Sequence, residues 1–279
     1  MRPTICFRVR APLGAALLAV IASADAAGDS IRLAMGTAVA ATPAPGRVLD
    51  LAFVGEGRIA VLLTDSVAVY EQDSGTLRRI DQLPMEATLA VRAPAGMIVS
   101  DAGDSSFWVS ANVAPGAVLF TIEGGRLKET QRSAALPFRG SPQGARFRPG
   151  TNLIDVTVPG LGNGPHLRAT AGETPWAIAP DGRLGVEGAG WSAHSVGSAA
   201  ALLWPGVWIV SSAQPAGAGD SLSIHGGAAR GTIVATFPAP AAVTAVAALV
   251  SSDRATVATG IAEGGGHRIV VMEIAREQP

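Results

Sequence analysis

Cysteine is almost absent from this 279-residue chain, because Cys6, near the N-terminus, is the only one. Disulfide scaffolds and thiolate zinc sites need several cysteines, so both classes are excluded. Lysine is equally scarce, since Lys128 is the only one among 21 basic residues. Charged residues make up 15% of the chain, and the formal net charge of −1 gives no electrostatic footprint for nucleic acid or an anionic membrane.

Apolar residues and backbone-breaking residues are abundant instead. The apolar fraction of 48% is too high for a disordered chain. The 34 glycines and 19 prolines argue against a helical bundle, because both residue types weaken helix interiors. They follow no three-residue period, so the chain is not collagen-like either.

The first 26 residues have the three-part layout of a secretory signal peptide. Three arginines lie within residues 1–10, an uncharged apolar run covers residues 11–23, and small residues lead up to Ala26. We predict cleavage after Ala26, which would change the formal net charge from −1 to −3 because three Arg and one Asp are removed. An uncleaved anchor and a buried N-terminal helix are the alternatives. Cys6 precedes the apolar run, so the chain is not predicted to be a lipoprotein.

The remaining 253 residues are predicted to work in the bacterial periplasm or to be secreted. The use of Arg in place of Lys, together with the excess of Ala, indicates a GC-rich coding sequence and favours a bacterial route. The longest apolar stretch after the leader, Val196–Val210, is too short to span a bilayer and is interrupted by Pro205. No integral membrane span is therefore expected in the mature chain.

One design recurs along the chain: short runs of Val, Ile, Leu and Ala are separated by Gly, Asp, Ser or Pro, as in strands and hairpins. The clearest passages are residues 51–71, 89–110, 201–225 and 246–274. A fourth run follows three of them, at residues 77–83, at 118–123 with 127–131, and at 231–237. The unit is thus a four-stranded meander starting near residues 48, 88, 199 and 243, and the long gap holds two more units, over residues 144–170 and 175–196.

Four-stranded repeats of about 40 to 45 residues are typical of β-propeller blades. The chain resembles the β-propeller superfamily, and its passage Thr174–Leu184 (TPWAIAPDGRL) is similar to the hairpins of NHL-like and YVTN-like propellers. The resemblance implies an all-β fold, with residues 27–279 forming a single propeller of about six blades. Five or seven blades remain open, and a β-sandwich or open barrel is the alternative fold.

The N-terminal run Ser30–Met35 is predicted to complete the last blade. The final unit ends after three clear strands, and propellers often borrow a fourth from the other end of the chain. Deletion of residues 27–36 should then lower the melting temperature sharply.

The motifs of most enzyme classes are missing. The chain has no phosphate-binding G-x-x-x-x-G-K-[ST], no H-E-x-x-H, no G-x-S-x-G and no Asp-x-Asp-x-Asp-Gly calcium loop. Its four histidines are isolated from one another. We therefore predict no catalytic residue, no cofactor and no metal ligand.

Six residues are candidates for contact with a partner or ligand. Trp191 lies among small residues that could leave it exposed to a partner, and His194 is nearby. Asp181 lies in a turn, and a basic cluster around two prolines could receive a carboxylate or phosphate. The candidates are Trp191, His194, Asp181, Arg139, Arg146 and Arg148.

Three functions are consistent with this sequence. The first is a non-catalytic propeller that serves as a protein-interaction scaffold for another envelope or periplasmic protein. The second is a propeller hydrolase or lyase with a cation at the central mouth. The third is a propeller that binds a small ligand or glycan.

Overall fold

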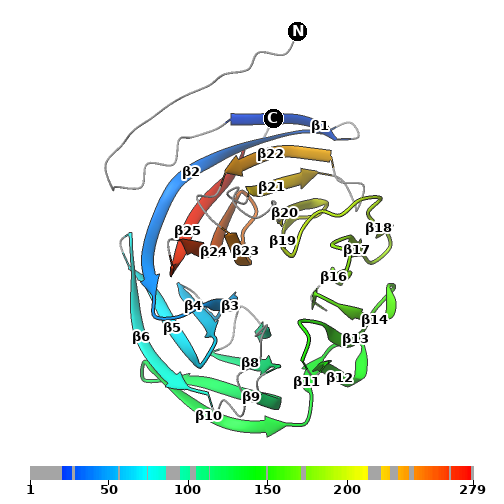
Figure 1. Cartoon of the computed structure of the whole chain (residues 1–279). Helices are drawn as coiled ribbons and strands as arrows, with labels where there is room; N and C mark the ends of the chain where they lie inside the picture. Colours follow the sequence, from blue (N-terminus) through cyan, green and yellow to red (C-terminus); the bar gives the residue numbers. More distant parts are fainter. Residues whose placement is uncertain are drawn as a thin grey trace.

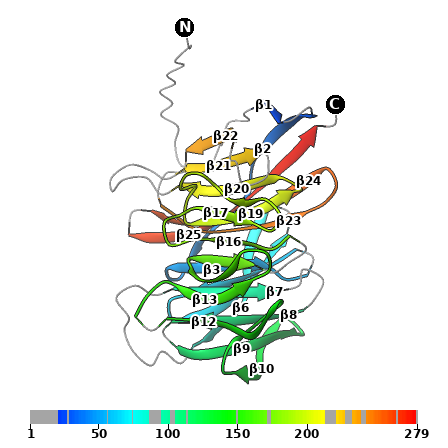
Figure 2. The ribbon, with the colours of Figure 1, turned by 90° about the vertical axis from the view of Figure 1, so that its right-hand side faces the viewer.

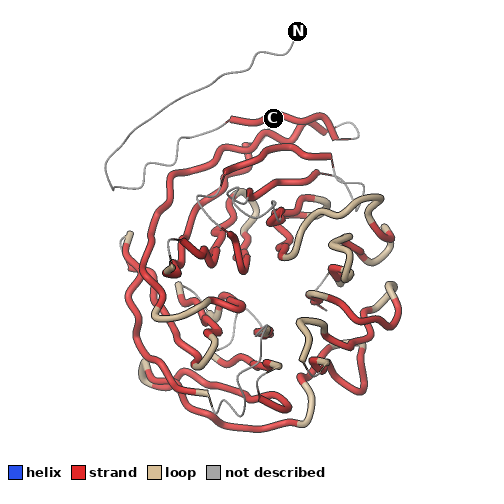
Figure 3. Tube along the Cα trace, viewed as in Figure 1, coloured by secondary structure: helices blue, strands red, loops and turns tan. Residues whose placement is uncertain are grey.

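A computed structural model describes most of the chain, and all of its regular structure there is β-strand (Figure 3). No helix in this part is long and apolar enough to cross a membrane. The described residues are 21–26, 29–55, 57–73, 75–85, 95–100, 105–112, 114–148, 150–170, 174–212, 221–226, 232–238, 242–263 and 265–277.

The strands form six antiparallel sheets arranged around a centre, so the chain is a six-bladed β-propeller (Figure 1). Seen at right angles, the innermost strands run along the ring axis (Figure 2). Blade 1 comprises β3 (Val48–Phe53), β4 (Arg58–Leu63), β5 (Ser66–Asp73) and β6 (Thr76–Pro84). Blade 2 comprises β7 (Gly96–Ser100), β8 (Ser106–Ala111), β9 (Ala114–Glu123) and β10 (Arg126–Ser133). Blade 3 comprises β11 (Leu136–Phe138), β12 (Ser141–Phe147), β13 (Ile154–Val158) and β14 (Gly162–His166).

Blades 4 to 6 follow in chain order. Blade 4 comprises β15 (Arg168–Thr170), β16 (Trp176–Ile178), β17 (Leu184–Val186) and β18 (Gly190–Trp191). Blade 5 comprises β19 (Ala199–Trp204), β20 (Val207–Ser212), β21 (Ser221–Gly226) and β22 (Thr232–Pro238). Blade 6 comprises β23 (Ala242–Val250), β24 (Arg254–Glu263) and β25 (Gly266–Glu277), which are joined by β2 (Asp29–Ala44) and β1 (Ile21–Ala26) from the N-terminal end of the chain. The predicted fold class is confirmed, and the sandwich and open-barrel alternatives are not.

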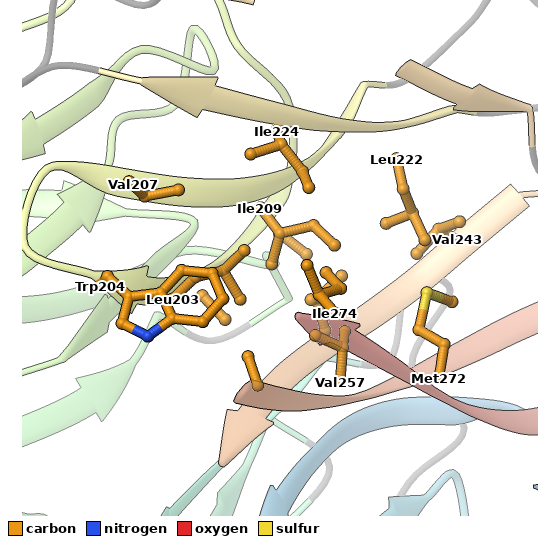
Figure 4. Packing of buried hydrophobic residues seen from close by; sticks show 14 residues of the cluster. Leu203, Trp204, Val207, Ile209, Leu222, Ile224, Val243, Val257, Met272 and Ile274 are labelled. Atoms are coloured by element: carbon orange, nitrogen blue, oxygen red, sulfur yellow. The ribbon is translucent and has the colours of Figure 1, made fainter. Parts of the chain in front are cut away.

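The hydrophobic core is divided among the spaces between blades. Figure 4 shows the cluster in which Ile209 and Ile224 of blade 5 meet Val257 and Ile274 of blade 6. Because both faces of a middle strand are covered in this way, β4 is buried along almost its whole length and reads as a continuous apolar run. The outer strand β10 is mostly exposed and correspondingly rich in charge.

The ring is closed by the N-terminal segment, as predicted. Strand β2 pairs antiparallel with β25 from Arg32↔Glu277 to Ala44↔His267, with two irregularities in register, and supplies the fourth strand of blade 6. It curves along the outside of the ring in Figure 1. Strand β1 then pairs with β2 as a fifth strand, outside the four that make a blade.

The predicted assignment of strands to positions within blades 2 and 3 was wrong. Gly96–Ser100 is the innermost strand of blade 2, not its second, and the expected first strand at residues 89–92 lies outside the described residues. Gly124 and Gly125 both have positive φ and make the hairpin between two separate strands, β9 and β10, instead of splitting one. Blade 3 accordingly starts at β11, before the expected residue 144.

Candidate functional site

The innermost strands enclose a cavity of about 320 Å³ at the centre of the ring, here called the channel cavity. It is lined by residues of β3, β7, β15, β19 and β23, and most of these residues are apolar or small. Among the described lining residues only Asp50 and Arg168 carry charge. Neither was among the residues selected from the sequence.

Arg168 connects blades that lie on opposite sides of the ring. It is the first residue of β15 in blade 4, and its Nη2 donates to the carbonyl oxygen of Leu49 in blade 1 over 2.9 Å. Its Nη1 donates to the carbonyl oxygen of Leu167 over 3.1 Å. Blades 1 and 4 are three positions apart in a ring of six, so this one side chain spans the channel.

Asp50 ties the same end of the channel to blade 2. Its side chain is 8% exposed, and its Oδ2 accepts a hydrogen bond of 2.8 Å from the backbone N–H of Ile98. Burial raises the pKa of Asp50 above its ordinary value, although the nearby positive charge of Arg168 and the backbone N–H of Ile98 act in the opposite direction. The channel therefore contains a desolvated carboxyl group whose burial is only partly offset by one guanidinium and by backbone N–H groups.

Asp181 and His194 lie in neighbouring loops at one edge of blade 4. The Asp181 carboxylate accepts from the backbone N–H of Arg183 over 3.1 Å and from its Nε over 2.7 Å, and the backbone hydrogen bond is the main reason that the pKa of Asp181 is lowered. The loop that carries His194 packs onto this turn, because Val196 N–H donates to the Gly182 carbonyl oxygen over 2.8 Å. Both Asp181 and His194 are exposed.

The three arginines of the predicted basic cluster are not gathered at one place. Arg139 follows β11 at the hairpin that leads into β12, whereas Arg146 and Arg148 lie at the far end of β12. The five residue-to-residue steps from Ser141 to Arg146 span about 17 Å of extended chain. Arg148 is paired with the carboxylate of Asp155 over 2.8 Å, and all three arginines are exposed.

Trp191 is half-buried between blades 3 and 4. Its ring stacks on the ring of His166 with centroids 5.9 Å apart. A Cβ at Gly185 would come within 2.8 Å of the same indole, so glycine is needed for Trp191 to lie across β17. The small residues near Trp191, which suggested exposure, therefore make room for packing.

His166 provides a test of this packing. It is 3% exposed, and neither ring nitrogen has a hydrogen-bond partner within the described part of the chain. Burial lowers its pKa below 6.5, against the attraction of Asp155. The unfolded chain therefore binds a proton more readily than the folded one, and stability contributed by neutral His166 is lost as pH falls from about 6.5 through the folded pKa.

We expect the melting temperature of His166→Phe to vary less between pH 7.5 and 5 than that of the unmodified chain. Phenylalanine keeps a ring against Trp191 but cannot titrate. His267, whose pKa is also lowered by burial, remains in both proteins as a common background. Identical pH profiles by calorimetry would show that His166 does not couple folding to protonation.

Groups of three or more His, Cys, Asp or Glu side chains that could hold a metal ion do not occur among the residues that the structure describes. The hydrogen bonds of Asp50 and Arg168 instead join blades 1, 2 and 4 through their innermost strands.

Comparison with known proteins identifies the fold. Neither a protein-family model nor a curated protein matches the sequence. Among solved structures, the crystal structure of Chaetomium thermophilum Raptor matches 88% of this chain with 10% identity and a TM-score of 0.52, and this chain spans 29% of that one. A chain of the Mitotic Checkpoint Complex matches 85% of this chain and 82% of its own length, with 11% identity and a TM-score of 0.44. The likeness to Raptor shows a shared β-propeller fold.

Proposed function

We propose that this protein is an exported, non-catalytic β-propeller that serves as a protein-interaction scaffold in the bacterial periplasm or envelope. The observation that carries the proposal is a set of three ordered turns at one edge of blades 3 and 4, with charged and polar side chains directed to solvent. We call this surface the blade 3–4 rim. It comprises residues 148, 150–153, 180–183 and 192–197.

The rim is held rigid by hydrogen bonds within and between blades. The Asn112 side chain of blade 2 donates to the Thr151 carbonyl oxygen over 2.6 Å, and Thr151 N–H donates to the Arg148 carbonyl oxygen over 3.1 Å. In blade 4, the Ser192 hydroxyl donates to the His194 carbonyl oxygen over 2.7 Å. A surface that is ordered before binding loses less entropy when a partner binds, which favours affinity.

The partner surface expected here is polar. Val250 is the only large apolar residue exposed among the side chains that the structure describes. Arg146, Arg148, Asp155, Asp181 and Arg183 are all exposed at or beside the rim. Complementary charges set specificity and association rate more than raw affinity, so we expect a specific, salt-sensitive complex with a charged protein surface.

Supporting evidence for the finer assignment comes from the sequence. The predicted signal peptide over residues 1–26 supports export, and the strand–turn–strand passage of Thr174–Leu184 supports kinship with NHL-like or YVTN-like propellers. Strands β16 and β17 do form the hairpin that this passage predicts.

Site-specific crosslinking in a Gram-negative host tests the proposal. A photo-crosslinking residue replaces His194 on the rim, and in a second protein it replaces Lys128 on the exposed strand β10. We expect the full chain to be exported with loss of its first 26 residues, and to form a discrete adduct in the periplasmic fraction only from position 194.

Charge reversal supplies the matched control. Arg146→Glu with Arg183→Glu should abolish the adduct from position 194, whereas Arg126→Glu with Lys128→Glu, the same change of charge on β10, should leave it intact. Retention of the chain in the cytoplasm contradicts the export proposal. An adduct unaffected by the rim variant contradicts the rim as the contact surface.

A further inference from the structure

We propose that the channel cavity binds a small aliphatic monocarboxylate, with the carboxylate group at Arg168 and the alkyl chain along the apolar wall. This site is distinct from the blade 3–4 rim and does not depend on the scaffold function. The inference rests on the size of the cavity, on its lining, and on the incomplete hydrogen bonding of Arg168.

The size and lining suit a short alkyl chain. The volume of about 320 Å³ is at the lower end of the range of small-molecule sites. Apart from Asp50 and Arg168, much of the lining consists of small aliphatic side chains, which leave space without offering polar partners. These residues include Ala52, Val99, Ala169, Ala201, Val246 and Ala248.

Arg168 has more donors than the described residues satisfy. Its guanidinium carries five N–H groups, and its recorded hydrogen bonds go to the carbonyl oxygens of Leu167 and Leu49. Its Nε is buried and has no acceptor within the described part of the chain. Buried donors in proteins are normally satisfied, so the guanidinium of Arg168 keeps a hydrogen-bonding capacity that its two backbone partners leave unused.

Asp50 does not fill that role. Its Oδ2 accepts from Ile98, and no ion pair joins it to Arg168 within 4.0 Å in the described residues. Burial also raises the pKa of Asp50, which weakens it as a counter-ion. A carboxylate is the ligand group that best fits a guanidinium, because it accepts two parallel N–H donors at once.

Titration calorimetry on the folded full chain tests the site with sodium butanoate as the probe and with 1-butanol and butylammonium chloride as controls. We expect saturable one-to-one binding of butanoate, a melting temperature that rises with its concentration, and binding at least about tenfold weaker for the alcohol and the ammonium ion. Equal binding of butanoate and 1-butanol would show that no carboxylate is recognised, and absence of butanoate binding would overturn the proposal outright.

Variants locate the binding. Ala248→Leu narrows the cavity without removing a charge and should weaken butanoate binding at least about tenfold. The pair Asp50→Asn with Arg168→Met, which leaves no unpaired buried charge, should abolish it, whereas Arg183→Met on the rim should bind as the unmodified chain does. Undiminished binding by the folded double variant would refute the assignment to Arg168.

Discussion

Removal of residues 1–44 is expected to prevent stable folding or to lower the melting temperature by about 10 °C or more, because the ring loses the strand that closes it. Strand β2 pairs with β25 over nearly its whole length, and Ala40 of β2 is buried against the core between blades 6 and 1. Without β2, the outer edge of β25 is unpaired and one side of that core is open to water.

A graded series of truncations distinguishes closure from a general effect of shortening. Among the strands that the structure describes, removal of residues 1–26 deletes β1 alone, the fifth strand of its sheet, and should leave the melting temperature nearly unchanged. Removal of residues 1–36 also deletes the pairs from Arg32 to Met35 and should give an intermediate loss. Equal melting temperatures for all three truncations, measured by calorimetry, would show that β2 does not close the ring.

Replacement of Arg168 by methionine is expected to destabilise the protein by about 1–3 kcal/mol, the range for leaving a buried polar group without its hydrogen-bond partner. The Leu49 carbonyl oxygen loses its donor, and Asp50 remains buried without the nearby cation. Methionine is similar in length to the aliphatic part of arginine, so lost packing contributes little. Chemical denaturation measures the change.

The same experiment on a double variant identifies the cause. Asp50→Asn keeps an oxygen that can accept from Ile98 N–H but removes the buried charge. We expect Asp50→Asn with Arg168→Met to be more stable than Arg168→Met alone, because the isolated carboxylate is gone. The exposed variant Arg183→Met serves as a control and should change stability by less than about 1 kcal/mol. A double variant less stable than Arg168→Met would contradict electrostatic coupling between the two residues.

Most blades could be predicted from local sequence because each strand is short and bounded by turn residues. The Pro180-Asp181-Gly182 turn is an example: Asp181 accepts from the following backbone, and Gly182 has a φ of 82°, a conformation that favours glycine. The order of strands in blade 2 was predicted wrongly for a physical reason. Strands buried on both faces lack alternation, so a first strand cannot be told from a second by its pattern.

The site residues show the opposite case. The small neighbours of Trp191 suggested that its side chain could be exposed, yet one of them, Gly185, makes room for its ring to pack. Asp50 interrupts the apolar run of β3, and this interruption was the one available signal for the channel. Its significance depends on Arg168, which lies in another blade.

The sequence by itself determined the β-propeller architecture, the approximate number of blades and the origin of the closing strand. These properties follow from short-range patterns of apolar and turn residues that each blade repeats. Tertiary structure alone decided the composition of the channel, because Arg168 reaches the carbonyl oxygen of a residue 119 positions earlier. Contacts between opposite blades depend on ring closure, which brings together side chains that no local pattern relates.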